Sequence, residues 1–111
     1  MTIFQDIIDG KIPCEKVFEN DKLIAFNDIA PQAPIHILIV PKKAIKGFQD
    51  LQEEDMHLLK EVAIVAQKLA KKFDIDDGYR IVTNNGESAG QTVFHLHFHL
   101  IGGRKLKGQL A

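Results

Sequence analysis

Residues 95–100 alternate strictly between histidine and a large apolar residue, in the order His-Leu-His-Phe-His-Leu. Successive side chains of a β-strand point to opposite faces, so this segment predicts a strand with one imidazole face and one apolar face. The apolar face, formed by Leu96, Phe98 and Leu100, has to be buried in a core. The chain must therefore build a sheet that covers a core on one side and presents three histidines on the other, with roughly 7 Å between neighbouring imidazoles.

Four further segments are expected to be strands of the same sheet. Apolar stretches on either side of a polar turn at residues 19–22 predict a β-hairpin, and β-branched residues predict the other strands. The segment 28–34 has two prolines, which remove backbone donors, and it is expected to be a loop. Short turns between strands are typical of antiparallel sheets. The expected strands are residues 17–18, 23–26, 35–40, 79–83 and 92–101.

Two helices are expected beside the sheet. Ile3, Phe4, Ile7 and Ile8 recur at helical spacing and predict a short helix that stops at Gly10. A long helix is expected to begin at a capping box formed by Asp50 and Glu53 and to end near Phe73. It has two adjacent apolar stripes, made by Met56, Leu59, Ala63, Ala66, Ala70 and Phe73, and by Leu58, Val62, Val65 and Leu69.

One face of a small sheet covers only one such stripe. We expect the other stripe to meet a second copy of the chain in a twofold dimer. The expected fold class is α+β: a five-stranded antiparallel sheet with one short and one long helix, dimerising into a larger sheet. A chain of 111 residues is the size of one domain, and we expect a single domain over residues 1–111.

Charge and cysteine content exclude several classes of protein. Lys plus Arg is 14 and Asp plus Glu is 15, so the chain lacks the basic excess of a non-specific nucleic-acid or membrane-surface binder. The single cysteine, Cys14, makes neither an internal disulfide nor a Cys-x-x-Cys zinc site. Acidic residues interrupt the N-terminal apolar run and no apolar run is long enough to span a membrane, so we expect a cytoplasmic protein. The basic segment 104–111 is expected to be a mobile tail.

The histidine face admits three interpretations. It is a solvated polar face, or it holds zinc with His36 as a further ligand, or it acts on a phosphate ester through a nucleophilic imidazole. The polar segment 84–91, with two glycines and several amide side chains, directly precedes the histidines and suits an anion. Thr92 adds a hydroxyl at the end of this loop. These features favour phosphate chemistry.

Residues 90–101 resemble the signature of the histidine triad superfamily, in which three alternating histidines are followed by apolar residues. Residues 25–36 and 40–43 resemble the family's upstream segments, and the resemblance extends from Ile3 to Arg104. Asn84 and the ending 101–104 resemble the Hint branch of nucleoside phosphoramidases, whereas residues 87–93 also resemble the dinucleoside polyphosphate hydrolases. The chain departs from some relatives in having neither a Cys-x-x-Cys pair nor a tryptophan in its tail.

The resemblance implies a role for each matching residue. His97 would be the nucleophile and form a nucleotidyl-imidazole intermediate, and His36 and His95 would orient it. Thr92 stands where the family often has serine, and would donate to the phosphate or the leaving group. The resemblance places Phe4, Ile7, Phe26 and Ile29 at the base, Asp28 at the ribose, and His99, Asn84 and backbone N–H groups near Gly90 and Thr92 at the phosphate. It also implies that Asn27 and Gln91 bind the nucleotide.

The implied function is hydrolysis of purine nucleoside 5′-phosphoramidates at the P–N bond, by a homodimer without cofactor or metal. Two alternatives stay open: a dinucleoside polyphosphate hydrolase of the same superfamily, and a purine nucleotide-binding regulator with little turnover. A zinc-binding interaction protein is disfavoured by the single cysteine.

Overall fold

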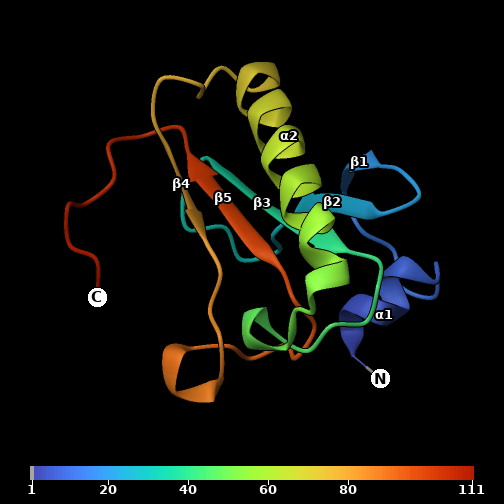
Figure 1. Cartoon of the computed structure of the whole chain (residues 1–111). Helices are drawn as coiled ribbons and strands as arrows, with labels where there is room; N and C mark the ends of the chain where they lie inside the picture. Colours follow the sequence, from blue (N-terminus) through green and yellow to red (C-terminus); the bar gives the residue numbers. More distant parts are fainter. Residues whose placement is uncertain (1) are drawn as a thin grey trace.

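The computed structural model describes residues 2–111, which build one antiparallel sheet, two α-helices and three short 3-10 helices (Figure 1). The sheet has five strands in the order β1-β2-β3-β5-β4, and every neighbouring pair is antiparallel. This confirms the expected fold class. The strands are β1 (Lys16–Glu19), β2 (Leu23–Asn27), β3 (Ile35–Pro41), β4 (Tyr79–Val82) and β5 (Phe98–Gly102), and the α-helices are α1 (Ile3–Ile8) and α2 (Met56–Lys72). The 3-10 helices are Phe48–Asp50, Glu53–Asp55 and Glu87–Ala89.

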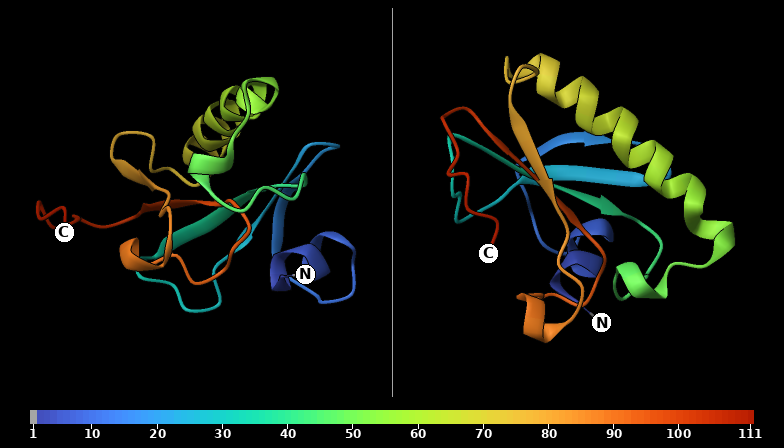
Figure 2. Two further views of the ribbon diagram at one scale, coloured as in Figure 1. Left: turned by 60° about the horizontal axis from the view of Figure 1, so that its bottom comes forward. Right: turned by 60° about the vertical axis from the view of Figure 1, so that its left-hand side comes forward.

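The two α-helices pack on opposite faces of the sheet (Figure 2). Alternate residues of β2 and β3 point to the two faces, because successive strand side chains do so. One set joins α2 in the larger core, which also contains the buried Leu96, Phe98 and Leu100. The other set, which includes Phe26 and Leu38, packs against Phe4 of α1. A cavity lies on the α1 face.

The last strand is shorter than predicted. We expected a strand over 92–101, but β5 covers only Phe98–Gly102 and residues 92–97 are irregular. The reason is the end of β3: Pro41 has no N–H to donate, so the strand that could continue the pairing stops there. Leu96 donates its N–H to the carbonyl of Ile45 instead, at 2.7 Å. The predicted burial of Leu96, Phe98 and Leu100 is confirmed, but His95 and His97 precede β5.

The long helix begins later than predicted. The expected capping box of Asp50 and Glu53 is wrong, because the box is formed by Gln52 and Asp55 and α2 begins at Met56. Asp55 is buried, accepts the N–H of Gln52 at 3.0 Å, and pairs with the ammonium of Lys43. The α-helix starts where these contacts end, and its C-cap is the expected Phe73.

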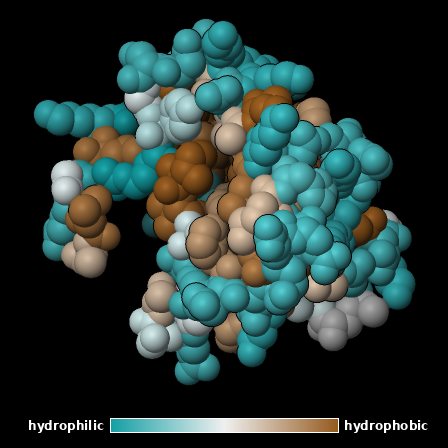
Figure 3. Space-filling model, in the orientation of Figure 1, coloured by the Kyte–Doolittle hydropathy of each residue, from teal (hydrophilic) through white to brown (hydrophobic). Residues whose placement is uncertain are grey.

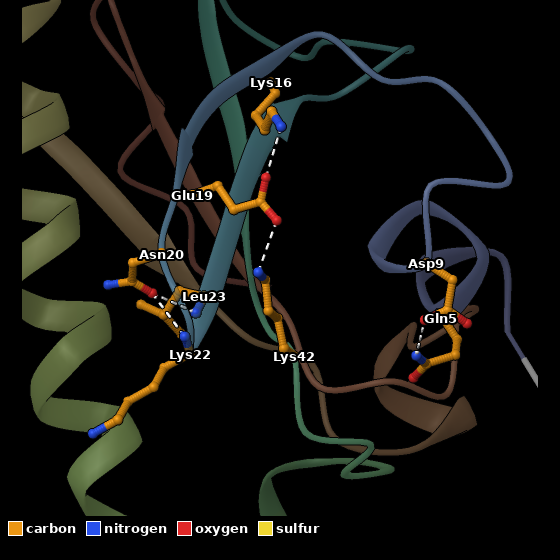
Figure 4. A network of polar contacts seen from close by, with 8 residues as sticks. All are labelled: Gln5, Asp9, Lys16, Glu19, Asn20, Lys22, Leu23 and Lys42. Atoms are coloured by element: carbon orange, nitrogen blue, oxygen red, sulfur yellow. Dashed lines mark hydrogen bonds and ion pairs between the residues drawn. The ribbon is translucent and has the colours of Figure 1, made fainter.

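The hairpin of β1 and β2 is held by side chains on its turn and edge (Figure 4). The Asn20 Oδ1 atom accepts the N–H groups of Lys22 and Leu23, at 2.9 and 2.8 Å. Glu19 pairs with both Lys16 and Lys42, which hold the pKa of its carboxyl down to about 2. Since Lys42 directly follows β3, these contacts tie the edge strand β1 to the third strand.

Part of the helix side of the molecule stays apolar at its surface. In the orientation of Figure 1, apolar side chains gather beside α2 (Figure 3). Ile64 of α2 and Ile81 of β4 are 36% and 42% exposed.

The segment 104–111, which was expected to be a mobile tail, makes two hydrogen bonds with the rest of the chain: Arg104 donates to the carbonyl of Gln32 at 2.9 Å, and Arg80 donates to the carbonyl of Lys107 at 2.7 Å. Among residues 2–111, neither helix has the length and apolar character that crossing a membrane requires.

Candidate active site

A cavity of about 360 Å³ lies on the α1 face of the sheet. Its walls come from α1, from the segment 12–15 that follows it, from the C-terminal end of β2 with the two residues after it, and from the start of β5. Most residues singled out from the sequence line it, namely Phe4, Ile7, Phe26, Asn27, Asp28, Ile29, Thr92, His97 and His99. The fold therefore brings together residues from both halves of the chain in one cavity of the size that small ligands occupy.

His97 has one nitrogen committed to the backbone. Its Nδ1 atom lies 2.7 Å from the carbonyl oxygen of His95, and a carbonyl can only accept, so Nδ1 bears the proton. The Nε2 atom of the neutral ring is then left with a free lone pair. The Phe4 ring packs edge-on at 4.9 Å between centroids, and burial lowers the pKa of His97 below its ordinary value. A neutral imidazole with a defined unprotonated nitrogen is a nucleophile ready for use.

His95 supports His97 through its backbone carbonyl. It is buried, and its Nε2 atom lies 2.7 Å from the carbonyl oxygen of Pro41 at the end of β3. The ring anchors residue 95, whose own carbonyl accepts the hydrogen bond from His97 Nδ1–H. His95, which the resemblance places among the catalytic residues, does not line the cavity and contacts His97 through this backbone carbonyl.

His36 and His99 form a hydrogen-bonded pair across the neighbouring strands β3 and β5. The backbone N–H of Gln32 donates to His36 Nδ1 at 3.0 Å, which leaves the proton of neutral His36 on Nε2. His36 Nε2 lies 2.9 Å from His99 Nδ1 and donates to it. The proton of neutral His99 is then on Nε2. Burial, followed by the neighbouring His97 and His36, lowers the pKa of His99 to about 4, so this ring is a neutral donor at pH 7.

Asp28 places a carboxylate in the cavity wall beside this pair. Its Oδ1 atom accepts the N–H of Ala30 at 2.8 Å, which forms a tight turn and fixes the side chain. Its Oδ2 atom lies 3.4 Å from His36 Nε2. A carboxylate oxygen has more than one acceptor position, so Asp28 can still accept from hydroxyl groups of a ligand.

Asp28, His36 and His99 are also the group whose arrangement resembles a metal site most, because their ligand atoms lie within 4.8 Å of one another. A metal needs a free lone pair on each ring nitrogen it binds. The bond from Gln32 to His36 Nδ1 places the His36 proton on Nε2, at the centre of the cluster. Moving that proton to Nδ1 would set two N–H donors against each other. The hydrogen bonds therefore place a proton between His36 Nε2 and His99 Nδ1, where a metal ion would need free lone pairs.

The glycine-bearing loop lies next to the cavity. Gly86 and Gly90 have φ values of +90° and +95°, which L side chains rarely adopt, and this explains the glycines. The amide of Asn84 lies close to Gly90, since a Cβ added there would be 3.9 Å from Asn84 Nδ2. Thr92 is exposed at the end of the loop and lines the cavity, whereas Asn84 and Gly90 do not line it.

Gln91, which was expected to bind nucleotide, is buried within the loop. Its Nε2 group donates to the carbonyls of Lys46 and Val93 at 2.8 and 3.1 Å, and its Oε1 atom accepts the N–H of Gly86 at 2.8 Å. The side chain has no free polar group directed to the cavity. The structure thus places Gln91 as a support of the loop.

Other residues of the cavity wall carry no sequence signal of their own. The segment after α1 contributes Ile12, Pro13, Cys14 and Glu15, whereas Ile3, Leu38 and Val93 belong to segments already singled out for other reasons. Cys14 was expected to be a structural thiol, and it is half-buried with its pKa raised mainly by burial. Only the folded chain brings this segment against β2.

A family model for the HIT domain matches residues 9–106. This range contains the three alternating histidines, His36 and Asp28. The chain belongs to the HIT family. A HIT-like protein of Chlamydia pneumoniae is 58% identical over 106 residues, which are 96% of each protein.

Solved HIT structures share the whole fold. A HIT family hydrolase from Legionella pneumophila Philadelphia 1 matches with a TM-score of 0.94 and 43% identity, over 97% of both chains. A histidine triad nucleotide-binding protein from Candida albicans matches with a TM-score of 0.83 and 32% identity, over 100% of this chain and 86% of that one. The chain is thus like the HIT family hydrolases in both fold and sequence.

Proposed function

We propose that this HIT protein hydrolyses purine nucleoside 5′-phosphoramidates at the P–N bond, through a nucleotidyl intermediate on His97. The observation that carries the proposal is the 2.7 Å contact between His97 Nδ1 and the His95 carbonyl. It directs the lone pair of Nε2 to the reaction and holds the ring in one orientation. The likeness to a HIT family hydrolase and to a histidine triad nucleotide-binding protein supports the proposal.

The proposed reaction has two displacements at phosphorus. In the first, Nε2 of His97 bonds to the α-phosphorus while the P–N bond breaks and the leaving nitrogen takes up a proton. In the second, water bonds to phosphorus and releases one proton, which balances the proton taken up by the leaving nitrogen. The bond to Nε2 then breaks, and a nucleoside monophosphate leaves with neutral His97 restored. Covalent catalysis of this kind divides one difficult step into two easier ones. The hydroxyl of Thr92 is the proposed route for the proton to the leaving nitrogen.

The nucleotide is proposed to lie along the cavity from the histidines to α1. The base would pack between Phe4 and Ile29, with Ile7 and Phe26 completing an apolar wall. The carboxylate of Asp28 would accept from the ribose hydroxyls. His99 would donate from Nε2 to a phosphoryl oxygen, with Asn84 and the backbone near Gly90 beside it; preorganised donors of this kind stabilise developing charge in the transition state.

A comparison of the rates on two substrates tests the function. The protein would be given a nucleoside 5′-phosphoramidate and a dinucleoside polyphosphate in separate reactions at equal concentration. Faster release of nucleoside monophosphate from the phosphoramidate supports the proposal. Preference for the polyphosphate would assign the chain to the other hydrolase branch, and saturable nucleotide binding with no turnover of either would make it a binding protein.

Two statements about the whole chain belong to the same proposal. We propose that residues 1–111 form a single HIT domain, since the family model spans 9–106. We also propose a homodimer that uses α2 and the edge strand β4. Ile64 and Ile81 are exposed there, and β4 has a neighbour on one side only. Pairing two such edges would make a larger sheet and remove both edges from water.

A further inference from the structure

The cavity wall contains a polar pair that the proposed mechanism does not use. Glu15 and Asn27 both line the cavity. Their backbones are joined by a hydrogen bond of 3.0 Å from Asn27 N–H to the Glu15 carbonyl. Their side chains are joined as well, because Asn27 Nδ2 donates to Glu15 Oε2 at 3.3 Å. The other polar groups of the wall, Asp28, Thr92 and the two histidines, are assigned to ribose and phosphate.

Glu15 lies at the side of the cavity away from His99. Glu15 directly precedes β1, at the edge of the sheet, whereas His99 is on β5, and the strand order places β2 and β3 between them. Neighbouring strands are about 4.8 Å apart, so three steps separate the two residues by roughly 14 Å. This separation is comparable with the length of a nucleoside monophosphate. A nucleotide whose phosphate reaches His99 therefore brings the far edge of its base towards Glu15.

A carboxylate at that edge distinguishes the purines. Carboxylate oxygens only accept hydrogen bonds. Guanine presents two adjacent donors, N1–H and the N2 amino group, which match the two oxygens of one carboxylate, whereas adenine presents one amino donor beside an acceptor nitrogen. The contact from Asn27 restrains the Glu15 side chain and lowers the cost of orienting it.

We propose that Glu15 determines base specificity and gives the cavity a preference for guanine over adenine nucleotides. The inference rests on the proposed function, since it takes the cavity to hold a purine nucleotide with its phosphate at His97 and His99. Glu15 is exposed and keeps contact with water. The expected preference is therefore modest, about five- to tenfold in dissociation constant, at the low end for bidentate recognition of a base.

Equilibrium binding of three monophosphates to the wild-type protein tests the inference by calorimetry. GMP offers both donors, IMP lacks only the N2 amino group, and AMP has neither N1–H nor N2. GMP should bind five- to tenfold more tightly than IMP and AMP. In Glu15→Gln, which replaces one acceptor oxygen by a donor and keeps the size, the three dissociation constants should agree within about twofold.

The matched control is Glu54→Gln, which removes the same charge from an exposed residue outside the cavity. It should keep the full preference for GMP, and unfolding curves of both variants should match the wild type. Equal binding of the three nucleotides by the wild type would overturn the inference, and so would a GMP preference that persists in Glu15→Gln. Failure of all three nucleotides to bind would instead overturn the proposed function, and the specificity with it.

Discussion

His36 Nε2 and His99 Nδ1 lie 2.9 Å apart, on adjacent strands of the sheet. Because the backbone N–H of Gln32 occupies the other nitrogen of His36, the proton between the rings belongs to His36. His99 is thereby compelled, as long as it is neutral, to present an N–H group from Nε2. The backbone N–H of Gln32 thus determines, through His36, which nitrogen of His99 is the donor.

Replacing the nucleophile should separate chemistry from binding. His97→Ala is expected to lower kcat by a factor on the order of 10⁴ or more, because deletion of a covalent nucleophile removes the intermediate. Nucleoside monophosphate should still bind, since Asp28 and the apolar wall remain. Steady-state kinetics and calorimetry measure the two effects, with unfolding curves as a check on folding. Retention of more than a tenth of wild-type turnover would contradict the covalent mechanism.

The pair of His36 and His99 should act as one unit. In a double-mutant cycle, His36→Ala and His99→Ala are each expected to lower kcat/KM, and the double variant should lose little more than His99→Ala alone. A coupling energy of about 1 kcal/mol or more is typical of residues in direct contact. A parallel cycle of His99→Ala with His57→Ala, an exposed residue of α2, should be additive. Additivity in the first cycle would refute the tautomer assignment.

Activity should depend on pH through His97. The neutral ring is the nucleophile, and burial lowers its pKa, so kcat/KM should rise with pH as the ring loses its proton and then become level. The midpoint of the rise should lie below the ordinary histidine value. Profiles from pH 4.5 to 8 on one phosphoramidate would show it, and His57→Gln should leave the profile unchanged. A midpoint above 6.5 would mean that His97 attacks from a more solvated site.

The Thr92 hydroxyl should matter most when the leaving group is poor. An alkylamine is a poorer leaving group than an arylamine, so its departure depends more on protonation. Thr92→Val should therefore slow an alkylamine phosphoramidate more than an arylamine phosphoramidate of the same nucleoside. Single-turnover rates for the two substrates measure this difference, with Thr92→Ser as the variant that keeps the hydroxyl. If Thr92→Val slows both substrates equally, Thr92 binds phosphate only.

The exposed apolar face of α2 and β4 should be a dimer contact. Sedimentation at micromolar concentration is expected to report roughly twice 12.5 kDa for the wild type. Ile81→Lys would place a charge in the contact and should give a particle of the single-chain mass. Leu110→Lys adds the same charge to an apolar residue that is 92% exposed in the last segment, and should leave the dimer intact. A monomeric wild type would leave Ile64 and Ile81 without a partner.

The sheet and its two faces follow from the sequence because periodicity reports burial directly. Leu96, Phe98 and Leu100 lie in the core as their alternation predicts, and the hairpin and the last turn of α2 lie where expected. The length of a strand is harder to predict, since it depends on whether a neighbouring strand is there to pair with it. The segment 92–97 has the composition of a strand, but Pro41 ends the strand beside it.

The candidate site shows the same division. Side chains with obvious chemistry, such as His97 and Asp28, are visible in the sequence. Their support is not, because it comes from backbone atoms that every residue has: the N–H of Gln32 and the carbonyls of Pro41 and His95. Glu15 was equally hidden, since an isolated acidic residue next to a predicted strand gives no sign that it lines a cavity.

These backbone partners have a consequence for how the protein can change over generations. The atoms that place the protons on His36, His95 and His97 belong to the main chain, so almost any amino acid could occupy position 32 without disturbing the triad. Proline is the exception at that position, since it alone lacks the N–H that His36 needs. Substitutions at position 32 can therefore accumulate while the tautomer of His36, and through it that of His99, is inherited unchanged.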